Sequence, residues 1–129
     1  MKKLFAALIG ILFVLPALGK EYKLFSPDKE TEVVVTVNTG ISIKANHHNS
    51  PLFSVDNISL DIKGKHFKTG IEQIKTESRN SVDRMIHPEI QEKYSKIRDH
   101  YNELLLEYKG DFSLTIRAYN NGIAYRFNT

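Results

Sequence analysis

Hydrophobic and polar residues alternate along most of the chain after residue 21, which predicts β-strands with one buried face. Residues with strong turn propensity, such as Ser26-Pro27-Asp28 and Lys63-Gly64-Lys65, separate the alternating segments. This spacing predicts an all-β fold, either an antiparallel sandwich or a barrel. The alternation is clearest in 33–37, 41–45, 58–62, 112–118 and 123–127, and further turns are expected at 38–40 and 46–51.

The C-terminal part contains the strongest hairpin signal. Asn121-Gly122 lies between two alternating segments, and both residue types tolerate the positive φ angles of a type I′ turn. Before this hairpin, the three leucines at 104–106 predict a further, more deeply buried strand.

The segment 69–99 shows a different pattern, with charged residues throughout. Pro88 followed by Ile90, Tyr94 and Ile97 fits one short helix, because proline is favoured in the first turn and the apolar spacing is helical. The alternative is an irregular crossover that connects two sheets. The pattern alone leaves both interpretations open.

The first 19 residues form a separate unit. They contain 14 hydrophobic residues, no acidic residue, and the basic pair Lys2 and Lys3 near the start. The small residues Ala17 and Gly19 complete the pattern of a secretory signal peptide, and we expect cleavage after Gly19. An uncleaved membrane anchor is the alternative, although the apolar run is short for a membrane span. With no cysteine in the chain, the expected location is the periplasm, without stable membrane insertion.

Charge argues against nucleic acid as a partner. Without Lys2 and Lys3 the formal net charge falls from +3 to +1. A surface that follows a phosphate backbone needs an excess of cations on one face. The charge balance therefore does not favour nucleic-acid binding.

No combination of residues indicates catalysis or a resident metal. His47 and His48 are adjacent, so on a strand their side chains would point to opposite faces; we expect an exposed turn and no metal site there. Asp99-His100 would suit a general base with an orienting acid, but no motif supplies a nucleophile. We therefore predict no catalytic residue and no cofactor in this chain.

Three segments resemble the N-terminal domain of glycoside hydrolase family 97. They read LFSPD at 24–28, IRDHYNEL at 97–104 and FSLTIRAYNNGIAYRF at 112–127, in the order found in that domain. With 1–19 already predicted as a signal peptide, the resemblance implies that 20–129 is an N-terminal β-sandwich domain. It also implies that the chain, which ends at Thr129, is an incomplete part of a larger super-sandwich.

The resemblance implies an exported α-glucosidase or α-galactosidase of polysaccharide-using bacteria, with a catalytic (β/α)₈ barrel and calcium near the catalytic carboxylates. None of the family's catalytic or calcium-binding residues maps onto this sequence, so we expect the chain alone to be inactive. We expect Arg98, His100, Asn102 and Glu103 to form polar contacts that fix the sandwich face or its docking to the barrel.

Two functions follow from the resemblance. The first is a non-catalytic domain that acts as scaffold and interface to the barrel of the same protein, with α-glucan or α-galactoside as the glycan. The alternative is a free-standing periplasmic β-sandwich module that binds carbohydrate or protein.

Overall fold

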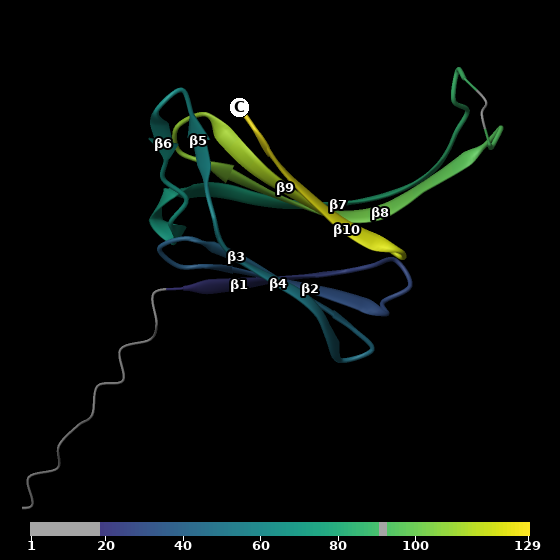
Figure 1. The fold of residues 1–129 in the computed structure, drawn as a ribbon, viewed down its shortest axis with the longest axis horizontal. Coiled ribbons are helices and arrows are strands. Elements are labelled where there is room, and N and C mark those ends of the chain that lie inside the picture. Colours follow the sequence, from purple (N-terminus) through teal and green to yellow (C-terminus); the bar gives the residue numbers. More distant parts are fainter. Residues whose placement is uncertain (1–18, 91–92) are drawn as a thin grey trace, which may run out of the picture.

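Two four-stranded antiparallel sheets lie face to face and make up most of the fold (Figure 1). The computed structural model describes residues 19–90 and 93–129, so the signal peptide predicted for 1–19 lies outside the described residues except for Gly19. The strands are β1 (Lys20–Phe25), β2 (Thr31–Val37), β3 (Ile41–His47), β4 (Ser50–Ile58), β5 (Leu60–Ile62), β6 (Lys65–Phe67), β7 (Ile74–Ile86), β8 (Ile97–Tyr108), β9 (Phe112–Tyr119) and β10 (Gly122–Asn128). The all-β sandwich predicted from the alternating pattern is confirmed.

The first sheet has the strand order β1-β2-β3-β4. Its inner face is built from β-branched residues at every second position, and Val35 lies opposite Ile43 while Val37 lies opposite Ile41. All four side chains are fully buried. Because side chains of a strand point alternately to the two faces, the polar residues between them lie on the outer face.

The second sheet has the strand order β10-β9-β8-β7. Leu104 lies opposite Ile116 and Leu106 opposite Leu114, and all four are fully buried against the first sheet. The buried strand predicted from the leucines at 104–106 is therefore confirmed as part of the longer strand β8. The core lies between the two inner faces.

The segment between β4 and β7 connects the first sheet to the second. It contains the two-stranded β5–β6 hairpin and one 3₁₀ turn, η1 (Ile71–Gln73), at the left of Figure 1. Phe67 of this segment packs edge-on against Phe112, with ring centroids 5.1 Å apart. The segment thus closes one end of the sandwich with apolar contacts.

The helix predicted from Pro88, Ile90, Tyr94 and Ile97 is wrong for the residues described. Ile97 begins β8, and the described part of 87–96 contains only bends and irregular chain. The alternative, a crossover between two sheets, is wrong as well, because this segment joins the antiparallel neighbours β7 and β8 of one sheet. Backbone pairing along the two long strands outweighs the local helical spacing of three apolar residues.

Two local predictions also need correction. The hairpin around Asn121 forms, but Tyr119 pairs with Gly122, and its turn lacks the positive φ angles of type I′. The alternating segment 58–62 is not one strand, since Ile58 ends β4 and Leu60 begins β5. Asn57, with a φ of 55°, bends the chain at this point.

The hydroxyl of Tyr108 is buried without a hydrogen-bond partner among the described residues. The ring stacks on Phe112 with centroids 4.7 Å apart, and burial raises the pKa of the phenol above its usual value. An unpaired buried hydroxyl lowers stability because it loses its bonds to water.

Replacing Tyr108 by phenylalanine keeps the stacked ring and removes the unpaired hydroxyl. We expect Tyr108→Phe to raise the free energy of unfolding by about 1 kcal/mol. Urea denaturation followed by circular dichroism measures the change. A loss of stability would show that the hydroxyl has a bonding partner in solution.

No helix among the described residues has the length and apolar character needed to cross a membrane.

Candidate functional site

Arg98 and His100 lie on the far half of β8 and share one acidic partner on β7. The Arg98 guanidinium donates two hydrogen bonds to Asp83, from Nε to Oδ1 and from Nη2 to Oδ2, each 2.9 Å long. His100 Nε2 lies 3.9 Å from Asp83 Oδ2. The hydrogen bond from Arg98 holds the pKa of Asp83 below its usual range. This bidentate pair connects the two strands near their exposed end.

Asn102 contacts both sheets. Its Nδ2 donates a 2.7 Å hydrogen bond to the backbone oxygen of Phe25 in β1, and its Oδ1 accepts a 2.7 Å bond from the Ser81 hydroxyl in β7. Arg79, two residues before Ser81, donates to the backbone oxygen of Lys23 in β1. The hydrogen bonds that Arg79 and Asn102 donate to β1, here called the polar seam, therefore connect the second sheet to the first.

Glu103 makes a different contact on the opposite face of β8. Its Oε2 accepts a 2.7 Å bond from Nε of Arg117, which lies opposite it in β9. The Arg117 guanidinium also lies over the Tyr101 ring, 4.2 Å from the centroid. The hydrogen bond to Glu103 is the main cause that raises the pKa of Arg117. The carboxylate and the aromatic ring together hold Arg117 in place.

The four motif residues do not converge on one site. Arg98, His100 and Asn102 occupy alternate positions on one face of β8, whereas Glu103 points to the other. Asp99, next to His100, pairs with Arg84 at 2.9 Å rather than with the histidine. The arrangement suits a set of contacts that hold strands and sheets together, and it contains no acid–base pair aimed at a substrate.

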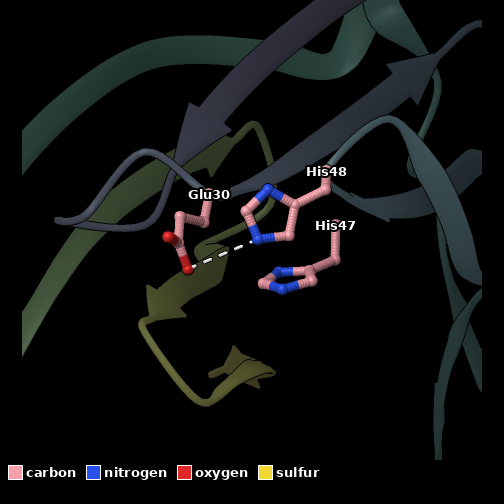
Figure 2. A group of neighbouring side chains, drawn as sticks. All are labelled: Glu30, His47 and His48. Atoms are coloured by element: carbon pink, nitrogen blue, oxygen red, sulfur yellow. Dashed lines mark ion pairs between the residues drawn. The ribbon is translucent and has the colours of Figure 1, made fainter.

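A second cluster lies where the turn between β1 and β2 meets the turn between β3 and β4, and its three members were not grouped from the sequence. Glu30, His47 and His48 each offer one ligand atom, and these atoms lie within 4.8 Å of one another (Figure 2). His48 Nε2 is 3.7 Å from Glu30 Oε2. The two imidazole rings meet edge to face with centroids 4.2 Å apart.

The backbone explains why two adjacent histidines point to the same place. His47 is the last residue of β3, but His48 has a φ of 48° and Asn49 a φ of 62°, so both form the turn into β4. The turn expected at 46–51 is found at His48 and Asn49, although His47 is still the last residue of β3. Asn49 belongs to a residue type that favours this left-handed conformation.

Glu30 reaches the histidines from the turn between β1 and β2. Asp28 Oδ1 accepts hydrogen bonds from the Ser26 hydroxyl at 2.5 Å and from the Glu30 amide at 3.0 Å. The hydrogen bond from Ser26 is the largest cause that lowers the pKa of Asp28. The amide of His48 also donates to the Glu30 carbonyl at 3.1 Å, which ties the two turns together.

The calcium implied by the family resemblance does not fit this cluster. Calcium takes six to eight oxygen ligands. Two of the three groups here are imidazoles. We therefore assign no calcium to the residues described.

The fold places this chain in the class of antiparallel β-sandwich domains, with two meandering four-stranded sheets and, within residues 19–90 and 93–129, no α-helix packed on either. A sequence comparison defines the class further. The chain belongs to the family described as Glycosyl-hydrolase 97 N-terminal, whose family model matches residues 24–129.

A curated relative supports the family at the level of sequence. A retaining alpha-galactosidase from Bacteroides thetaiotaomicron is 33% identical to this chain over 128 residues. The matched segment is 98% of this chain and 19% of the relative. The chain therefore spans about a fifth of the length of that enzyme.

Solved structures support the fold. A glycoside hydrolase family 97 enzyme from Pseudoalteromonas sp. strain K8, in complex with acarbose, superposes with a TM-score of 0.66 at 14% sequence identity. A variant enzyme from the same strain, in complex with panose, has a TM-score of 0.64. Each match covers 82% of this chain and 17% of the other.

Proposed function

We propose that the chain is the non-catalytic N-terminal domain of an exported α-glycosidase of the α-glucosidase or α-galactosidase type. In this proposal it serves as scaffold and docking surface for a (β/α)₈ barrel of the same protein, which carries the active site and its calcium. The observation that carries the proposal is the family match over residues 24–129 in a chain that spans 19% of a retaining alpha-galactosidase. The leader at 1–19 supports export to the periplasm.

The far ends of β7 and β8 provide the docking surface in this proposal. Residues 82–86 and 97–100, here called the arm, reach beyond the first sheet at the right of Figure 1. Met85 and Ile86 are 55% and 39% exposed, and Ile97 across the hairpin is 47% exposed. The arm thus presents apolar side chains next to the Arg98–Asp83 ion pair, a combination that suits an interface with a second domain.

A chimera tests the proposal. The chain replaces the matching segment of the retaining alpha-galactosidase, and hydrolysis of p-nitrophenyl α-galactoside is measured. We expect the chimera to be active and the isolated chain to be inactive. An isolated chain that hydrolyses the substrate, or a chimera without activity, would contradict the proposal.

A matched pair of variants separates docking from folding. We expect Met85→Ser with Ile86→Ser to lower the activity of the chimera at least tenfold and to leave the melting temperature of the isolated chain unchanged. The control is Leu52→Ser with Phe53→Ser, which changes two residues of β4 that are 57% and 42% exposed. Equal losses from both pairs would show that the arm is not the docking surface.

A further inference from the structure

We propose that Glu30, His47 and His48 form a binding site for a divalent transition metal of the zinc type. The inference does not depend on the proposed function. It rests on the position of three ligand side chains at the meeting point of two turns, as Figure 2 shows.

The type of ligand selects the type of metal. Imidazole nitrogen suits zinc, copper and nickel, whereas calcium and magnesium prefer oxygen. Two imidazoles and one carboxylate form a set found in zinc sites that keep one position open to water. The side chains of Glu30 and His48 are 50% and 64% exposed, so solvent has access to the fourth position.

The distances are close to those of a bound metal. Ligands about 2.1 Å from a tetrahedral zinc ion lie about 3.4 Å from each other. His48 Nε2 and Glu30 Oε2 are already 3.7 Å apart, and all three ligand atoms lie within 4.8 Å. The three atoms therefore lie near the spacing that a bound zinc ion requires.

The surrounding structure restricts the ligands before a metal binds. The Thr31 hydroxyl lies 2.9 Å from His47 Nδ1, and Thr31 pairs with His47 across β2 and β3. Hydrogen bonds to a ligand histidine fix the ring orientation and strengthen metal binding. The backbone bond from the His48 amide to the Glu30 carbonyl holds the other two ligands near each other. Because these hydrogen bonds already restrict the ligand residues, metal binding costs less conformational entropy.

A bound metal would connect the β1–β2 turn with the β3–β4 turn. A metal that binds the folded state but not the unfolded state raises the free energy of unfolding. We therefore expect zinc to stabilise this end of the first sheet. The effect assigned to the metal is to stabilise the contact between these two turns, with water in the fourth coordination position at the surface.

Isothermal titration calorimetry with zinc chloride tests the proposal on the chain purified without a histidine tag. We expect one zinc ion per chain, a rise in melting temperature with zinc, and no response to calcium at the same concentration. We also expect zinc binding to weaken in acid, because only neutral imidazole binds a metal.

Variants locate the site. We expect Glu30→Gln, His47→Gln and His48→Asn each to weaken zinc binding at least tenfold. His48→Asn is the most conservative for the fold, because asparagine tolerates the positive φ of an exposed turn residue. The control is His66→Asn, at an exposed histidine that also contacts a carboxylate, Asp61, at 2.7 Å.

Loss of zinc binding and of the zinc-dependent rise in melting temperature in His48→Asn, with both kept in His66→Asn, supports the site. Absence of zinc binding by the parent chain would overturn it. Equal weakening by His66→Asn, or full binding by His48→Asn, would overturn it as well.

Discussion

Replacing Leu104 by alanine is expected to lower the free energy of unfolding by about 3–4 kcal/mol. Leu104 is fully buried in β8 and faces the first sheet next to Ile116. The change removes apolar contacts and leaves a cavity between the two sheets. The sheets cannot move together to close this cavity, because hydrogen bonds within each sheet hold its backbone in place. Urea denaturation measures the loss.

The control for this prediction is another leucine of the same chain. Leu52 in β4 is 57% exposed, so we expect Leu52→Ala to change the stability by no more than about 0.5 kcal/mol. If both variants lost the same stability, the core would not lie between the sheets as described. A large loss confined to Leu104→Ala supports the sandwich packing.

The two halves of the IRDHYNEL segment make different contacts, and a pair of double variants separates their contributions to stability. We expect Asn102→Ala with Glu103→Ala to lower the free energy of unfolding by about 2–3 kcal/mol. Asn102 bonds to the Phe25 carbonyl of the first sheet and Glu103 bonds to Arg117. The change breaks the polar seam and leaves the half-buried Arg117 guanidinium without its carboxylate.

The matched variant is Arg98→Ala with His100→Ala, for which we expect an unchanged melting temperature in the isolated chain. Arg98 and Asp83 are both largely exposed, and exposed ion pairs contribute little to stability. In the chimera, however, this double variant is expected to lower activity, because the pair lies in the arm. A large stability loss from Arg98→Ala with His100→Ala would show that the arm folds as part of the sandwich core.

The strands with a buried face were predictable because their alternation reports burial directly. Val33, Val35 and Val37 in β2 and Leu114 and Ile116 in β9 are fully buried, and each lies in a predicted strand. Alternation with a period of two residues indicates a strand that has one face in the core and the other exposed to solvent. The all-β class and the C-terminal hairpin followed from these residues.

The strand β7 was missed because its side chains are mostly exposed. It has 13 residues, among them Arg79, Asp83 and Arg84, and neither face shows an apolar alternation. Its structure comes from backbone hydrogen bonds to β8, which leave no trace in the sequence pattern. The apolar residues near Pro88 suggested a helix for the same reason, since local spacing does not reveal a distant pairing partner.

The cluster at Glu30 was missed for a geometric reason. Thr31 and His47 face each other across β2 and β3, so Glu30 comes near the histidines only once the register of the two strands is set. The second histidine joins the site because His48 leaves the strand with a positive φ. The sequence separation between Glu30 and His47 gives no indication of either event.

The order of strands also has a consequence for how the chain folds. In both large sheets every strand pairs only with its neighbours in sequence, β1 to β4 in one and β7 to β10 in the other. Each hairpin therefore forms by closing a short loop, at a small entropy cost. The contacts between Leu104 and the first sheet join residues far apart in the chain, and contacts of this kind slow folding. We therefore expect docking of two preformed sheets to limit the folding rate.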